Sequence, residues 1–135
     1  MGALARTMLA LLIGASLAPA ASAADEPAYA RNGLTQGGVQ VSGRDQETWA
    51  DAEVNLPLGE GDRIWVHDDG KVEVHLTGGF FIRAKEPTSL DVLSLNAGSI
   101  QFYLDRGHAY VNNLRGGIKV VQLDVPLASV RSYDN

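Results

Sequence analysis

The chain of 135 residues contains no cysteine. That absence excludes disulfides, zinc ribbons, iron–sulfur clusters and thiol catalysis. It also excludes a lipid anchor, which would need a cysteine just after an export signal. Small exported domains often depend on disulfides, so we expect this chain to be held together by its hydrophobic core alone.

Basic residues are few: 11 Lys and Arg stand against 16 Asp and Glu, for a net charge of −5. They are scattered singly along the sequence, whereas nucleic-acid binding needs clustered cations. The carboxylates are equally dispersed, and there is no Gly-x-Ser-x-Gly elbow and no P-loop. We therefore predict no nucleic-acid partner and no enzymatic activity, with no catalytic, cofactor-binding or metal-binding residues.

The N-terminal segment has the pattern of an export signal. Arg6 supplies positive charge, residues 8–18 form an apolar run, and Ala21-Ser22-Ala23 fits the small-x-small cleavage rule. A membrane-spanning helix needs about 20 apolar residues, so this run is too short. We predict a signal peptide over 1–23, a short polar leader over 24–28, no membrane span after cleavage, and a periplasmic or secreted protein.

Beyond the leader, apolar and polar residues alternate, as in half-buried strands. Segments 71–76, 80–84 and 99–104 place Val72, Val74, Leu76, Phe80 and Ile82 on the inward face. Glycine-rich turn clusters separate such segments at intervals of about 8–12 residues, the spacing of a sandwich or barrel. We predict an all-β domain over 29–135, built of two packed antiparallel sheets as a sandwich or a short, solenoid-like β-roll.

Several local features refine this prediction. The apolar parity shifts by one residue at Val92-Leu93 and again at Val120-Val121, which indicates a bulge or a corner at each. The segment Asp68-Asp69-Gly70 is typical of a type I turn closed by a glycine with positive φ. Trp49 and Trp65 are suited to capping a thin core.

The C-terminal segment predicts a final strand with no partner after it. A last strand begins at 128–133, and the sequence stops at Asn135 without a closing turn. We expect this strand to lie at a sheet edge and the domain to lack its closing C-terminal strands. An exposed edge of this kind could bind a protein partner by strand addition.

The ordered set of motifs over about 29–133 resembles the FecR-like periplasmic domain. The segments that carry the resemblance are Trp49, 52–58 (AEVNLPL), 61–65 (GDRIW), 71–76 (KVEVHL), 107–111 (GHAYV) and 121–126 (VQLDVP). In these segments, Pro57 and the glycines around it form a turn, in which Asp62 is expected to accept backbone N–H groups.

The resemblance implies an exported recognition domain without catalysis, whose partner is an unidentified protein or polymer of the cell envelope. Regulators of that family also carry a cytoplasmic sigma-factor-binding segment and a membrane helix. Here a cleavable signal takes their place, so the protein is not expected to relay a signal inward. The family usually has Thr before the closing Pro, where this chain has Val125, and a link to iron uptake is correspondingly weak.

Two alternative functions rest on particular residues. Gly61, His67, Asp69 and Glu73 echo the first cupin motif, and with His108 they could hold Fe(II) or Mn(II). The motif is incomplete, and the histidines fit a surface turn equally well. Alternatively, the aromatic residues that do not follow the core parity could stack on sugars of an envelope polymer; these are Phe81, Tyr103 and Tyr110.

Overall fold

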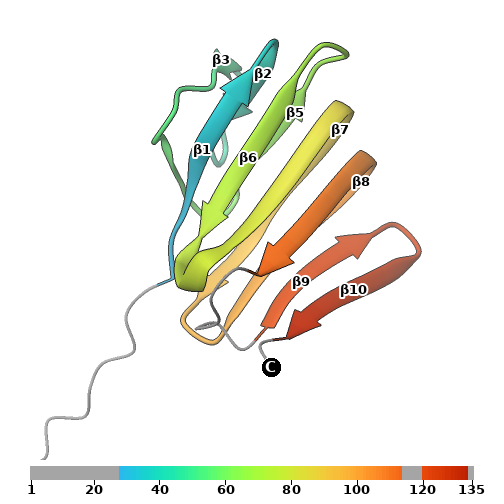
Figure 1. Ribbon diagram of the computed structural model, residues 1–135. Helices are drawn as coiled ribbons and strands as arrows, with labels where there is room; N and C mark the ends of the chain where they lie inside the picture. The colour runs from blue at the N-terminus through green and yellow to red at the C-terminus, as the bar shows by residue number, and fades with distance from the viewer. Residues whose placement is uncertain (1–27, 114–119, 134–135) are drawn as a thin grey trace, which may run out of the picture.

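The computed structural model describes residues 28–113 and 120–133 as one curled β-sheet (Figure 1). The predicted signal peptide, 1–23, and most of the leader lie outside the described residues. The elements are β1 (Ala30–Gln36), β2 (Val39–Ser42), β3 (Ala50–Asp51), β4 (Pro57–Leu58), β5 (Arg63–Val66), β6 (Lys71–Leu76), the 3-10 turn η1 (Thr77–Gly79), β7 (Phe80–Asn96), β8 (Ser99–Asn113), β9 (Val120–Val125) and β10 (Ala128–Tyr133). No helix among the described residues is long and apolar enough to cross a membrane.

The long antiparallel pair β7–β8 is the spine of the sheet. The first half of β7 pairs with β6, which pairs with β1, and β1 continues to β4. The second half of β7 pairs instead with β5, which pairs with β2 and then β3. The sheet therefore divides into two arms that share one spine and curl toward each other.

The all-β prediction is confirmed, whereas the prediction of two packed sheets is not. All ten strands of the described ranges belong to one hydrogen-bonded sheet, because β7 and β8 run through both arms without interruption. The pairing is also not wholly antiparallel, since β8 and β9 run parallel from Ser99↔Val120 to Tyr103↔Asp124. β10 pairs with β9 alone, so it is an edge strand of the described sheet, as expected.

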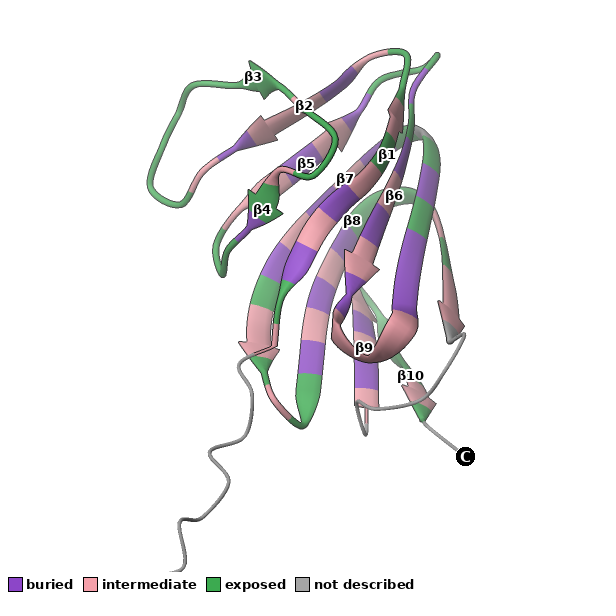
Figure 2. Ribbon diagram, turned by 60° about the vertical axis from the view of Figure 1, so that its left-hand side comes forward, coloured by how far each residue is buried: buried purple, intermediate pink, exposed green. Residues whose placement is uncertain are grey.

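The concave side of the curled sheet holds the core (Figure 2). The five residues predicted to point inward along β6 and β7 are all buried, and Ile64, Leu90, Ile100 and Phe102 join them from neighbouring strands. The prediction for the tryptophans is wrong. Trp49 is 39% exposed, and Trp65 alternates away from the core residues on either side of it. Each indole lies instead beneath an arginine, Arg63 or Arg106.

A corner at Lys85–Ser89 is where β7 leaves one arm and enters the other, and the register with β8 shifts there. The buried Thr88 stabilises this corner: its hydroxyl donates to Lys85 O at 3.0 Å and accepts from His108 N at 3.2 Å. Opposite it, Gly107 has a φ of 94°, a conformation that a residue with a Cβ rarely adopts.

The predicted irregularities have mixed outcomes. At Val92-Leu93 a bulge is present: Val92 pairs with Phe102 and Ser94 with Gln101, so Leu93 is the extra residue and turns outward. At Val120-Val121, the described residues 120–125 keep a regular register, and the residues before Val120, on which the predicted shift also depends, lie outside the described ranges.

The turn at 67–70 closes with a hydrogen bond from Gly70 N to His67 O at 2.8 Å. Gly70 does not have the predicted positive φ. Glycine is required there for space, since a Cβ would collide with Gly38 O and lie 2.8 Å from Val66 Cγ1. The role predicted for Asp62 is confirmed, because its carboxylate accepts from Gly59 N at 2.7 Å and from Arg44 N at 3.2 Å.

Candidate binding groove

The outer face of the arm β1–β6–β7–β8 presents side chains, most of them polar, in two rows that cross the strands. The first row is Gln36, Lys71, Lys85 and His108, and the second is Leu34, Glu73, Arg83 and Tyr110. Each residue is the direct cross-strand partner of its neighbours in the row. Because neighbouring strands are about 4.8 Å apart, each row repeats at that spacing.

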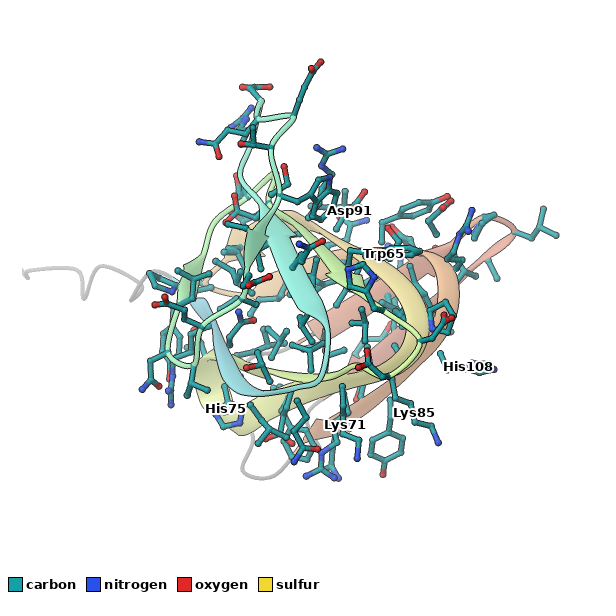
Figure 3. The ribbon with its side chains drawn as sticks, turned by 90° about the horizontal axis from the view of Figure 1, so that it is seen from above. Trp65, Lys71, His75, Lys85, Asp91 and His108 are labelled. Carbon is teal, nitrogen blue, oxygen red and sulfur yellow. The ribbon has the colours of Figure 1, made fainter. Side chains whose placement is uncertain are left out.

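These eight side chains line a groove of about 590 Å³. Its size lies within the range of small-ligand sites. Lys71, Lys85 and His108 point away from the core on the outside of the sheet (Figure 3). The two remaining lining residues, Ala84 and Ala109, belong to the core face of the sheet, so the floor between the rows is formed by strand backbone.

A bulge in β1 turns Leu34 into this groove. Asn32 pairs with Val74 on the core side, Gly33 is the extra residue, and Leu34 then pairs with Glu73 on the outer side. The imidazole of His75 lies over Gly33, in the space that a Cβ at this position would enter. Asn32 is fully buried, and its amide donates to Glu53 O at 3.4 Å.

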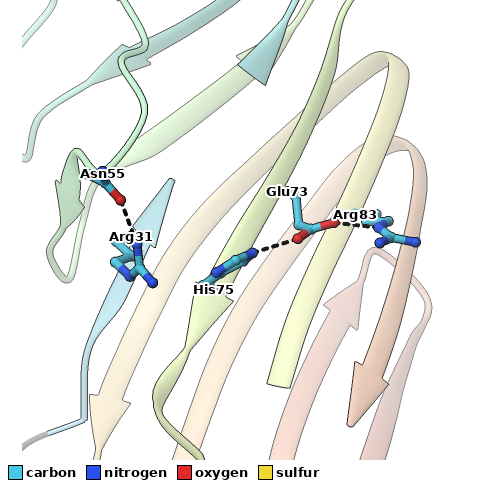
Figure 4. A network of polar contacts seen from close by, with 5 residues as sticks. All are labelled: Arg31, Asn55, Glu73, His75 and Arg83. Carbon is cyan, nitrogen blue, oxygen red and sulfur yellow. Dashed lines mark hydrogen bonds and ion pairs between the residues drawn. The ribbon is translucent and has the colours of Figure 1, made fainter. Parts of the chain in front are cut away.

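Among the described residues, Glu73 is the only acidic side chain that lines the groove, and it is already paired. Its carboxylate accepts from Arg83 Nε at 2.5 Å and lies 2.5 Å from His75 Nε2 (Figure 4). Burial opposes ionisation of Glu73, but the hydrogen bonds and positive charges of these two partners outweigh it and lower its pKa. Glu73 is 15% exposed and Arg83 is 55% exposed, so the guanidinium still faces solvent.

The two lysines of the first row face each other across β6 and β7. Lys71 and Lys85 are direct cross-strand partners, and like charges in that arrangement destabilise a sheet. Neither forms an ion pair with another residue that the structure describes. The groove is therefore locally basic on a chain whose net charge is −5.

Replacing Glu73 by glutamine tests the network beneath the groove. A lowered folded-state pKa means that the carboxylate stabilises the fold above about pH 4.5, and that this contribution is lost as the pH falls through the folded-state value. We expect Glu73→Gln to lower the free energy of unfolding, measured in urea at pH 7, by about 1 kcal/mol. The loss is modest because the partners of Glu73 are partly solvated.

The difference between Glu73→Gln and the parent should shrink steadily below pH 4.5. The exposed Glu47→Gln is the matched control and should match the parent at every pH. A difference that stays constant from pH 7 to the acid limit would contradict the assignment of Glu73 as a stabilising carboxylate.

The four metal ligands of the cupin alternative, His67, Asp69, Glu73 and His108, do not come together. Glu73 and His108 line the groove, whereas His67 and Asp69 lie in the turn between β5 and β6. His67 Nδ1 accepts from Trp65 Nε1 at 3.2 Å, and its Nε2 lies 3.0 Å from Gln40 Oε1. Within the described ranges, no three His, Cys, Asp or Glu side chains are grouped as metal ligands.

The three aromatic candidates for sugar binding also separate. Tyr110 lines the groove and is 59% exposed. Phe81 lines a neighbouring hollow of about 560 Å³, but it is buried beneath the guanidinium of Arg83, 4.6 Å from its ring centroid. Tyr103 lies on the other arm, where it pairs with Asp91.

Sequence reasoning missed the lysine pair and Arg83, because cations that are isolated in the sequence become neighbours only through strand pairing. The available signal was a cation at outward positions of two consecutive alternating segments, Lys71 in 71–76 and then Arg83 and Lys85 in 80–85. Reading that signal requires the register, which the sequence alone does not provide.

Comparison with known proteins adds no identification: no family model, curated protein or solved structure matches this chain.

Proposed function

We propose that this protein is a non-catalytic recognition domain of the periplasm or cell envelope, and that it binds an anionic ligand in the outer groove of β1–β6–β7–β8. The observation that carries the proposal is the directly opposed pair of Lys71 and Lys85. A bound carboxylate or phosphate would relieve the repulsion between the two ammonium groups, so binding would also stabilise this arm of the sheet.

The remaining lining of the groove suits the same role. Arg83 is fixed by Glu73 yet remains solvent-facing, so it is a positioned hydrogen-bond donor. His108 adds a further donor at the end of the lysine row. Leu34 and Tyr110 flank the cations with apolar surface, a mixture typical of ligand sites.

The location and the domain type are supported by the sequence. The export-signal pattern of 1–23 favours a periplasmic or secreted protein. The motif order from Trp49 to 121–126 supports a FecR-like domain. The groove crosses the KVEVHL segment of that motif set, at Lys71 and Glu73.

The proposal is tested by titrating the protein with a panel of anionic probes at low ionic strength, using isothermal calorimetry. The panel is inorganic phosphate, tetragalacturonate, polyglutamate and single-stranded DNA, with maltotetraose as the neutral reference. At least one anionic probe should bind, and Lys71→Gln/Lys85→Gln should weaken its affinity about tenfold or more through loss of charge-assisted hydrogen bonds.

Arg44→Gln/Arg131→Gln is the matched control, because it removes the same charge from two arginines that do not line the groove. It should leave the affinity within about twofold of the parent, apart from the weak long-range effect of net charge. The proposal is wrong if no anionic probe binds, or if both double variants weaken binding equally.

A further inference from the structure

The groove has a length and a direction. Its first row extends from Gln36 on β1 to His108 on β8, across three strand-to-strand steps of about 4.8 Å, roughly 14 Å in all. Lys71 and Lys85 lie at its two middle positions, and His108 lies at its end. An occupant that meets them all must be extended and must carry repeated acceptors along one side.

The second row differs in character from the first. Its ends are Leu34, 38% exposed, and Tyr110, 59% exposed, and its middle is the Glu73–Arg83 pair. An occupant of the groove therefore meets cations along one side and, along the other, apolar surface at the two ends with a polar pair between them. Pyranose rings with carboxylate substituents match this pattern, since each ring has an apolar face and a polar edge.

We infer that the ligand of this groove is a linear polysaccharide that contains uronic acids, lying across the four strands; this inference rests on the proposed anionic-ligand function. The carboxylates of consecutive sugars meet Lys71 and Lys85, and one ring lies against the face of Tyr110. A pyranose ring is about as long as one strand-to-strand step, so a groove of roughly 14 Å accommodates about three rings.

The structure argues against two other polyanions. An extended acidic peptide is bound most effectively at a sheet edge, through main-chain hydrogen bonds. The lysines instead lie on a sheet face, over β6 and β7, which are paired on both sides at that point. A nucleic acid needs many phosphate contacts, whereas the described lining of this groove offers few cations and the net charge of −5 repels a long polyphosphate.

The inference is tested with oligogalacturonates of one, two, three, four and eight residues, by calorimetry. The affinity for an oligogalacturonate should rise with each added sugar up to about three or four sugars. It should then level off, because the groove is filled. Tyr110→Ala should weaken the tetramer about tenfold and leave binding of the monomer nearly unchanged. Tyr133→Ala, an equally exposed tyrosine on β10, is the control and should change neither.

The outcomes separate this inference from the function on which it rests. If the monomer binds as tightly as the tetramer, or if polyglutamate or single-stranded DNA binds more tightly than the tetramer, the polysaccharide inference is wrong. Anion binding in the groove then stands, provided that Lys71→Gln/Lys85→Gln still weakens the tighter probe. If no probe binds, both fail.

Discussion

Replacing Gly107 by alanine is expected to lower the free energy of unfolding by about 2–4 kcal/mol. Two costs combine at this position. The backbone has a φ of 94°, which strains any residue with a Cβ. The added methyl would also collide with Pro87 O and Thr88 Oγ1, across the corner at which β7 changes arms. Neither neighbour can move easily, because Thr88 is fully buried and hydrogen-bonded.

Urea unfolding measures this cost, and Gly98→Ala is the matched control. Gly98 lies in the β7–β8 turn without a positive φ, and the space that its Cβ would enter is open to a distance of 4 Å. Alanine there should therefore change stability by less than about 0.5 kcal/mol. If Gly107→Ala is as stable as Gly98→Ala, the corner is not rigid, and the alignment of Lys85 with His108 that depends on it is in doubt.

Replacing Phe102 by alanine should cost about 3–5 kcal/mol. Phe102 is fully buried on β8, where it pairs with Val92 on β7 and with Leu123 on β9. Its removal leaves a cavity at the point where the spine meets the C-terminal strands. With no disulfide to hold the fold, a loss of this size is a large part of the stability of a small domain.

Tyr110→Ala provides the comparison, because it removes an aromatic ring from the outer face of the same strand. Its ring is mostly exposed, so the change in unfolding free energy should stay within about 0.5 kcal/mol. Equal losses for Phe102→Ala and Tyr110→Ala in urea unfolding would mean that the two faces of β8 are not divided into core and surface as described.

The strands were predictable where alternation is strict. Val72, Val74 and Leu76 lie inward as their pattern requires, and the parity break at Val92-Leu93 marks a real bulge. These features are local, because side-chain direction in a strand follows from the position of each residue along the chain. The prediction that Asp62 accepts backbone N–H groups in its turn is also correct, and it follows from equally local chemistry.

The curled single sheet and the groove were not predictable, since both depend on pairing between distant segments. Nothing in the sequence of 80–96 shows that one strand pairs with β6 in its first half and β5 in its second. The parallel pairing of β8 and β9 has no local signal either. In the same way, Lys71 and Lys85 become neighbours only through the β6–β7 register.

We propose that strand pairing assembles an anion-binding groove on the outer face of β1–β6–β7–β8. Backbone amide NMR during titration with tetragalacturonate tests it most directly, because each strand reports separately. We expect the largest chemical-shift changes on residues of the two rows, including Leu34, Lys71, Lys85 and Tyr110, and little change on β9 and β10. Changes centred on β9–β10, or no saturable change at low ionic strength, would contradict it.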